Sequence, residues 1–212
     1  MTAKQDVLTR VRSALTGARA PGPVPRDYRT TTGLTLEQQL DLLTDRLLDY
    51  KAGVRRTDRA GLPAAVAAAV AAGLPAGLAG RARLVVPPGL DRGWLAEVDA
   101  DVVVDDGLAA TELDRLQGVV TAATVAVAET GTFVLDGSPD QGRRAITLVP
   151  DLHVCVVFAS QVVGGVPEAV ALLDPTRPTT WVSGPSATSD IELVRVEGVH
   201  GPRTLEVVLV TP

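Results

Sequence analysis

The six residues HVCVVF at positions 153–158 decide the fold class of this chain. They form an apolar run just after Pro150 and Asp151, which is typical of a short buried strand. Similar strand patterns occur at 54–57, 84–86, 102–104, 133–135, 180–183 and 203–210. Helical patterns lie between them at 58–72, 91–98, 111–116, 143–148 and 167–173. This alternation predicts an α/β fold, with a mostly parallel sheet, right-handed crossovers and helices on both faces.

Composition excludes several classes of protein. The chain has 212 residues, 46% of them hydrophobic, which is typical of one folded domain with a terminal extension and not of a disordered chain. Its net charge of −5 and its 3% aromatic content argue against a nucleic-acid partner. Charged residues interrupt the first fifteen positions, and no apolar run has the length of a membrane span. We therefore expect a cytoplasmic protein with no membrane partner.

Cysteine and motif content limit the chemistry. Cys155 is the one cysteine, so an intramolecular disulfide and a cysteine-ligated iron–sulfur cluster are excluded. The sequence has no G-x-G-x-x-G, no P-loop, no H-E-x-x-H and no C-x-x-C motif, and we predict no cofactor. Ser186, Asp190 and His200 occur in the order of a hydrolase triad, but Ser186 and Asp190 are too close in sequence to favour one.

The first fifty residues predict a helical extension. Apolar residues recur at helical spacing within 2–18, and a proline-rich linker follows at 21–27. A second helix is predicted after Thr35, which has capping-box spacing with Gln38, and Gly53 is its expected stop. The stripe on this helix favours packing against the main domain over a dimer seam, although an oligomer is possible; it comprises Leu36, Leu40, Leu43, Leu47 and Tyr50. We therefore divide the chain into an extension at 1–50 and an α/β domain at 51–212.

Four segments of the second half carry a family resemblance. They are AETGT at 128–132, GRR at 142–144 with LVPDLH at 148–153, SGPSATSDIE at 183–192, and GVHGP at 198–202. Their order and spacing resemble the LUD-domain family over about residues 50–212. The resemblance implies a three-layer fold similar to CoA-transferase-like and ribose-phosphate-isomerase-like domains.

The resemblance also implies a function. Members of this family accompany iron–sulfur proteins in the oxidation of L-lactate to pyruvate, and the companion proteins supply the cluster ligands. We therefore expect an accessory component that binds a small anionic metabolite and carries no cluster. Two alternatives stay open. One is a stand-alone acyl- or CoA-transferase-like or isomerase-like enzyme with Glu129 as nucleophile or base, and the other is a non-catalytic regulatory or assembly subunit.

Residues 129–132 supply the first candidate site residues. Glu129 follows an apolar run, and partial desolvation would raise the pKa of its carboxyl group and prepare it for proton transfer. Thr130 and Thr132 add hydroxyl groups, and Gly131 allows either close approach of a ligand or a positive φ. The structural alternative is that Glu129 accepts backbone N–H bonds and holds the turn at Gly131.

The later segments supply the remaining candidates. Arg143 and Arg144 begin a predicted helix, where a guanidinium and helix N–H groups can bind a carboxylate or phosphate; the alternative is that one of them pairs with an acidic neighbour. A strand-to-helix loop above carboxyl strand ends is predicted at 184–186. The candidates from this region share polar or small side chains: Gly184, Ser186, Thr188, Asp190 and His200.

The two histidines have structural and functional interpretations. His153 in a buried strand is more often a hydrogen-bonded core residue than a catalyst. Cys155 points to the same sheet face and is expected to be inert. A divalent metal site formed by His153, His200 and Asp190 is disfavoured, because the spacing of these residues is not that of a dense ligand set. We expect the segments 129–132, 143–144 and 183–190 to line one pocket.

Replacing Glu129 by Gln separates the two interpretations of this residue. A desolvated functional carboxylate predicts loss of ligand response with an unchanged or raised melting temperature, since burying a charge is costly. A carboxylate that holds the Gly131 turn predicts a stability loss of about 1–3 kcal/mol. Thermal unfolding combined with a ligand-binding assay distinguishes the outcomes, and destabilisation with retained binding assigns Glu129 to the scaffold.

Overall fold

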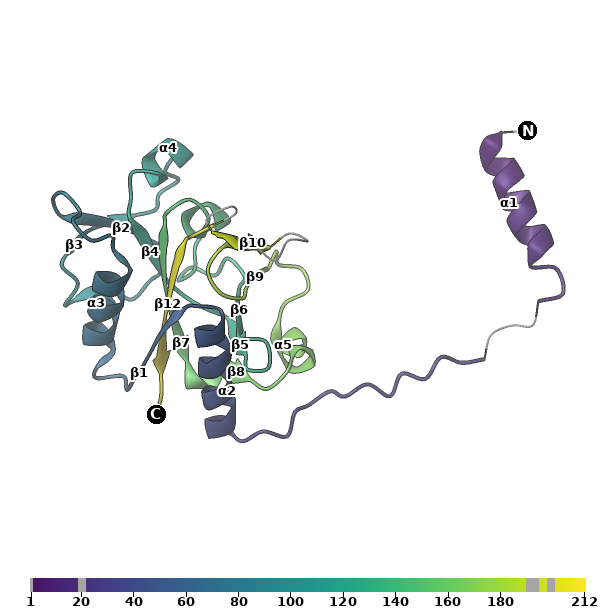
Figure 1. Cartoon of the computed structure of the whole chain (residues 1–212), viewed down its shortest axis with the longest axis horizontal. Coiled ribbons are helices and arrows are strands. Elements are labelled where there is room, and N and C mark those ends of the chain that lie inside the picture. The colour runs from purple at the N-terminus through teal and green to yellow at the C-terminus, as the bar shows by residue number, and fades with distance from the viewer. Residues whose placement is uncertain (1, 19–21, 190–194, 198–200) are drawn as a thin grey trace.

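A six-stranded, wholly parallel sheet forms the centre of the molecule in a computed structural model (Figure 1), which describes residues 2–18, 22–189, 195–197 and 201–212. The strand order is β1-β12-β7-β4-β2-β3. The strands are β1 (Gly53–Thr57), β2 (Ala82–Val86), β3 (Ala100–Val104), β4 (Gly118–Ala122), β7 (Leu152–Phe158) and β12 (Thr204–Val210). The predicted α/β class is confirmed, and the run at 153–158 is the third strand in this order.

Side chains of the central strands alternate between two separate cores. On β7, Val154 and Val156 pack in one core with Val66 of α3 (Leu62–Gly73), whereas Cys155 and Val157 pack in the other. This alternation follows from the two-residue period of a strand. The central strands are buried on both faces, which explains why their sequence is almost continuously apolar. As predicted, Cys155 is buried, and burial raises the pKa of its thiol.

The leucine stripe of α2 (Leu36–Asp49) fills the second core. Thr35 caps the helix and forms the predicted capping box with Gln38. Leu40, Leu43 and Leu47 are each 1% exposed and share a core with the sheet, so the stripe packs on the body of the chain as favoured. The predicted extension and the α/β domain, divided at residue 50, therefore share one hydrophobic core.

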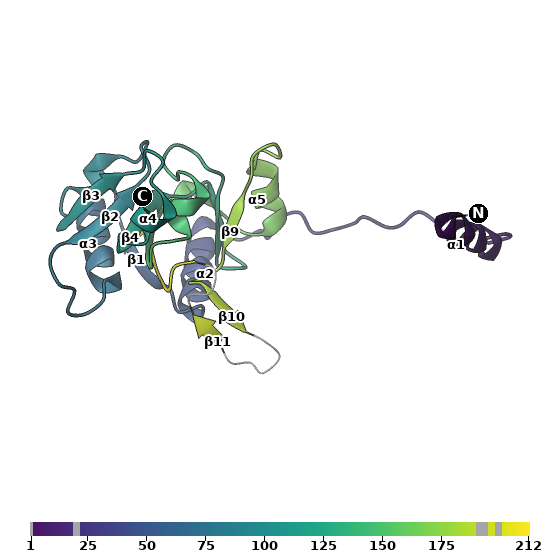
Figure 2. The same ribbon diagram turned by 90° about the horizontal axis from the view of Figure 1, so that it is seen from above.

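A second, smaller sheet lies beside α2 and covers the rest of this face of the large sheet. It has the order β8-β5-β6-β9 and consists of β5 (Val125–Val127), β6 (Thr132–Leu135), β8 (Val162–Val163) and β9 (Thr180–Val182). Ala126 and Phe133 face the core of α2, while Val125 and Val134 pack against Ala169 of α5 (Val166–Leu172). The layers are thus α3, the large sheet, α2 with the small sheet, and α5 (Figures 1 and 2).

The apolar run at 119–128 is two strands instead of one. It breaks at Ala123 and Thr124, and β4 before the break belongs to the large sheet whereas β5 after it belongs to the small one. The Thr124 amide donates to the carbonyl of Val134, which starts the pairing of β5 with β6. Both strands are buried, so hydrophobicity gives no sign of the change of sheet.

Several predicted helices are shorter than the sequence suggested. The patterns at 91–98, 111–116 and 143–148 form the single turns η1 (Arg92–Leu95), α4 (Ala110–Leu113) and η2 (Arg144–Thr147). A further turn, η3 (Ala159–Gln161), follows β7. Asp58 accepts a hydrogen bond from the amide of Gly61 instead of capping α3 directly. The cap of α3 is Gly61, and the helix begins at Leu62.

The first helix, α1 (Ala3–Ala14), lies apart from the body of the chain (Figures 1 and 2). It has no buried residue, and Thr2 caps it through a capping box with Gln5. Residues 22–35 have no regular secondary structure, in agreement with the predicted linker, although residues 19–21 lie outside the described part of the chain. In the described residues no helix combines the length and the apolar character that crossing a membrane requires.

A hairpin replaces the helix predicted after Gly184. β10 (Ala187–Ser189) pairs antiparallel with β11 (Arg195–Glu197), and the hairpin extends away from the body (Figure 2). The preceding strand β9 is antiparallel to β6. The prediction of a helix start after a parallel strand was therefore wrong, because short polar segments rich in Ser and Thr have the same composition in a helix cap and in a hairpin.

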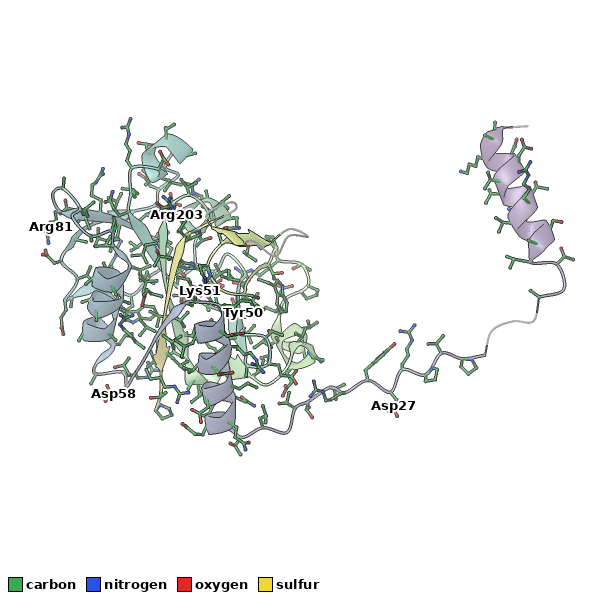
Figure 3. The ribbon with its side chains drawn as sticks, in the orientation of Figure 1. Asp27, Tyr50, Lys51, Asp58, Arg81 and Arg203 are labelled. Carbon is green, nitrogen blue, oxygen red and sulfur yellow. The ribbon has the colours of Figure 1, made fainter. Side chains whose placement is uncertain are left out.

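The end of α2 has an unusual residue in a left-handed conformation. Lys51 has φ 66°, its amide donates to the carbonyl of Leu48, and the amide of Ala52 donates to that of Leu47. These two bonds form a Schellman motif, which glycine usually closes. Figure 3 shows Tyr50 and Lys51 at this end of the helix. The stop predicted at Gly53 lies two residues later, where β1 begins.

Replacing Lys51 by Gly should stabilise the fold by about 0.5–1 kcal/mol. Left-handed geometry costs a residue with a Cβ atom about 1–2 kcal/mol, and the greater unfolded-state entropy of glycine offsets part of that gain. Urea unfolding of the two proteins measures the difference. Lys51→Ala serves as the control, because alanine removes the charge and keeps the Cβ atom. Equal stability of the Gly and Ala variants would contradict the explanation.

Candidate functional site

A cavity of about 230 Å³ lies where the small sheet meets the amino-terminal ends of β7 and β12. His153 and Leu205, the second residues of these strands, form its floor. Turn η2 and strand β9 form its walls. We call it the Arg144 cavity, and its lining is Arg144, Thr147, His153, Thr180, Trp181, Val182, Ser183, Gly184, Pro185, Ser186, Gly201, Pro202 and Leu205.

Arg144 brings a positive charge to this cavity. Its Nη1 atom donates to the hydroxyl of Thr147 at 3.1 Å, and that hydroxyl donates to the Arg144 carbonyl at 3.1 Å, so the two residues fix each other across one turn. Desolvation lowers the pKa of Arg144. Among the residues that the structure describes, no carboxylate forms an ion pair with this guanidinium. An anion in the cavity would therefore find a positioned donor without a competing internal partner.

Arg143 has a different role from its neighbour. Its Nε and Nη2 atoms donate to the two carboxylate oxygens of Asp105 at 2.7 and 2.8 Å, and Nη2 also donates to the carbonyl of Leu108. The hydrogen bond from Arg143 holds the pKa of Asp105 below its usual value. Of the two predicted arginines, one pairs with an acidic residue and the other faces the Arg144 cavity. The contribution expected from a helix N-terminus is missing, since η2 is a single 3₁₀ turn.

His153 contributes a neutral ring. It is 2% exposed, its Nε2 atom lies 2.8 Å from the Thr121 hydroxyl, and its ring meets Phe133 edge to face. Burial, reinforced by the nearby charge of Arg144, lowers the pKa of His153 to about 3. The side chain is therefore uncharged at neutral pH and forms a hydrogen-bonded part of the cavity floor.

A chain of hydroxyl groups connects the segment 130–132 with the cavity wall. Thr130 Oγ1 donates to Thr132 Oγ1 at 2.8 Å, and Thr132 Oγ1 lies 2.6 Å from Ser183 Oγ. Ser183 lines the cavity, whereas neither threonine does. Ser186 also lines it, and its amide donates to the carbonyl of Pro202. Thr130 and Thr132 thus support the site indirectly.

Two glycines of the predicted site serve the packing of α2. Gly131 has φ 59°, and a Cβ atom there would lie 2.6 Å from Cβ of Arg46. Gly184 has φ 86°, and its Cβ would lie 2.6 Å from Cβ of Tyr50. Of the two alternatives for Gly131, the structure shows the positive φ, together with close approach of a helix and not of a ligand.

Glu129 lies outside the Arg144 cavity. Its carboxylate pairs with Arg29 at 2.7 Å, and its side chain is 32% exposed. Its own amide donates to the carbonyl of Gly164. Within the described residues the carboxylate accepts no backbone N–H, so the alternative in which it holds the Gly131 turn lacks its hydrogen bonds. The one pocket predicted for residues 129–132, 143–144 and 183–190 thus contains Arg144, Ser183, Gly184 and Ser186 but not Glu129.

Comparison with known proteins assigns the family. The LUD domain matches residues 108–210. A curated protein named lactate utilization protein C from Deinococcus radiodurans is 45% identical, over 98% of this chain and 95% of its own length. The chain belongs to the LUD-domain family. A lactate utilization protein C from Bacillus velezensis is 25% identical over 86% of this chain and 82% of its own length.

A solved structure shares the LUD-domain fold. It is a DUF162 family protein from Deinococcus radiodurans, with a TM-score of 0.69 and 41% identity, and the match covers 84% of this chain and 99% of that one. The resemblance of the four segments to the family is therefore confirmed. The α/β architecture expected for the domain, with a parallel sheet between two covering layers, is the one described above, and α5 lies outside the small sheet as a further layer.

Three further residues were predicted as ligand-binding: Thr188, Asp190 and His200. Thr188 lies in β10, opposite Val196 of β11. Asp190 and His200 lie outside the described residues, so two of the three residues in the disfavoured metal site cannot be placed. The described part of the chain holds no group of three or more His, Cys, Asp or Glu residues suited to a metal ion.

The cavity also lies at a different edge of the sheet from the one predicted. The sequence favoured the carboxyl strand ends, whereas His153 and Leu205 mark the amino ends of their strands. Sequence reasoning missed Thr147, although its spacing of three from Arg144 is that of neighbours on a 3₁₀ turn. It also missed Asp105, since a partner 38 residues away leaves no local signal.

The depressed pKa of His153 predicts a steep acid dependence of stability. In the folded protein the pKa is about 3, against 6.5 for a free side chain, so the unfolded chain binds the proton first as the pH falls. The stabilising contribution is complete above pH 6.5 and is lost toward the folded pKa. Between pH 6 and 4 the wild type should lose up to about 1.4 kcal/mol per pH unit more than His153→Gln, which keeps a hydrogen-bonding group and does not titrate.

Urea unfolding at pH 7, 6, 5 and 4 measures this difference. Both proteins retain His200, so the comparison isolates His153. Parallel pH profiles for the two proteins would show that the buried ring does not resist protonation.

Proposed function

We propose that this LUD-domain protein is an accessory component of lactate utilization that binds a small organic anion in the Arg144 cavity. Its relatives of matching length are named lactate utilization protein C, which supports the pathway. The observation that carries the ligand class is Arg144, a cavity arginine held by Thr147 and without an acidic partner in the described residues. A carboxylate such as that of lactate or pyruvate complements this charge.

The other lining groups suit recognition better than proton transfer. Thr147, Ser183 and Ser186 line the same cavity as the cationic guanidinium, and hydroxyl groups can donate to or accept from a ligand oxygen. His153 is neutral at neutral pH, and Glu129 does not line the cavity. These features support a binding component over the transferase alternative, in which Glu129 would have to reach the bound acyl group.

The single cysteine supports a scheme in which one protein binds the acid and other proteins accept its electrons. Oxidation of lactate to pyruvate releases two electrons and two protons, and an electron acceptor must take up the electrons. Cys155 is buried, and one thiol cannot hold a cluster. We therefore propose that iron–sulfur companion proteins accept the electrons, while this chain binds the acid. The proposal needs no nucleic acid and no membrane.

Thermal unfolding with added acids tests the ligand class. L-lactate, pyruvate and inorganic phosphate are titrated against the wild type, Arg144→Gln and Arg92→Gln. A ligand at one hundred times its dissociation constant stabilises the folded state by about 2.7 kcal/mol. Loss of a charged hydrogen bond costs about 1.5–3 kcal/mol, so Arg144→Gln should weaken binding about tenfold to a hundredfold.

Arg92 is the matched control. Arg92 is an exposed arginine at the first position of η1, as Arg144 is at the first position of η2. It lines neither the Arg144 cavity nor the cavity next to it. Arg92→Gln should bind as the wild type does. Equal binding by Arg144→Gln and the wild type would contradict the proposed site, and the absence of binding by every acid would contradict the ligand class.

A further inference from the structure

The Arg144 cavity adjoins a second and larger one. This outer cavity has a volume of about 560 Å³, and Arg144, Thr147 and Thr180 line both. The remaining residues of the outer cavity are Pro88, Asp105, Gly107, Leu135, Gly137, Ser138, Pro139, Gly142, Arg143 and Pro178. The guanidinium of Arg144 therefore lies at the boundary between two spaces and not at the end of one.

The two cavities have different chemical character. Ser183 and Ser186 line the inner cavity alone, beside the Arg144 guanidinium, with which no carboxylate of the described residues forms an ion pair. In the outer cavity the charges of Arg143 and Asp105 cancel, because these residues form a two-point ion pair and the Asp105 side chain is 5% exposed; the charge of Arg144 lies at the boundary with the inner cavity. Its other lining residues include the rings of Pro88, Pro139 and Pro178 and the aliphatic side chain of Leu135, and the hydroxyl residues Ser138, Thr147 and Thr180 lie among them. Such a surface favours an uncharged, apolar group.

The volumes of the two cavities give an independent indication of the size of the ligand. Binding cavities for small molecules usually have volumes of roughly 300–1,000 Å³. The Arg144 cavity, at about 230 Å³, is below this range, whereas the outer cavity, at about 560 Å³, is within it. A three-carbon acid would occupy the inner space and leave the apolar walls of the outer one in contact with water.

We infer that the site binds an amphipathic organic acid, with its carboxylate on Arg144 and an apolar chain in the outer cavity. This inference rests on the proposed function, since it uses the same anion site. It extends the ligand class beyond the small acid, to monocarboxylates with an extended aliphatic part. The shared residues Thr147 and Thr180 lie where the polar head and the apolar tail would join.

A series of straight-chain monocarboxylates from acetate to octanoate tests the inference by isothermal titration calorimetry. Each buried methylene group should lower the dissociation constant about threefold to fourfold, until the outer cavity is filled. Arg144→Gln should weaken binding of the long and short acids alike. Pro178→Trp should remove the dependence on chain length, since an indole ring at this exposed lining position takes the space of the aliphatic chain in the outer cavity.

Pro175→Trp is the matched control. Pro175 is exposed in the same connecting segment as Pro178 and lines neither cavity. This variant should keep the chain-length dependence of the wild type. The same pattern in Pro175→Trp and Pro178→Trp would overturn the placement of the tail.

The outcomes separate this inference from the proposed function. Arg144-dependent binding that is equal for acetate and octanoate overturns the inference and leaves the small-anion site intact. A chain-length dependence that persists in Arg144→Gln places the apolar chain elsewhere and also overturns it. If no acid of any length binds, the proposed anion site fails and the inference fails with it.

Discussion

Burial of the central strands on both faces is the constraint on which the rest of the structure depends. Residues of β7 and β12 alternate between a core under α3 and a core under α2, so each strand needs a complete layer on either side. On one side a helix supplies that layer. On the other, α2 supplies part of it through Leu40, Leu43 and Leu47, and the small sheet supplies the remainder. A missing layer would expose alternate side chains of the most apolar strands.

The close packing of α2 also determines the backbone around the site. Two glycines with positive φ, Gly131 and Gly184, allow this helix to approach the small sheet at distances that a Cβ atom would prevent. Gly184 immediately follows Ser183, whose hydroxyl contacts Thr132. The position of the cavity wall is thus coupled to the seating of the helix. Residues that resemble a ligand-binding loop in sequence therefore serve packing and site geometry together.

The neighbouring arginines show how one dipeptide can serve two purposes. Arg143 is neutralised by Asp105 and ties the start of η2 to the end of β3. With that turn anchored, Arg144 is directed to the other side and is fixed by Thr147. The first residue uses its charge in an ion pair, and the second has no ion-pair partner among the described residues. The nearby His153 stays neutral, which avoids a buried positive charge beside Arg144.

The sequence by itself determined the features that depend on local pattern. The parallel α/β class, the capping box of α2, most strand positions and the family follow from periodicity and short motifs, which report on neighbours in the chain. Tertiary structure alone decided that residues 119–128 divide between two sheets, that residues 187–189 form a hairpin strand, and that Glu129 lies away from Arg144. It also decided which of the two arginines forms an ion pair, because the partner of Arg143, Asp105, lies 38 residues away, directly after β3. The physical reason is that burial and ion pairing depend on which segments contact each other in space. The residue types within a segment do not indicate which distant segment it will contact.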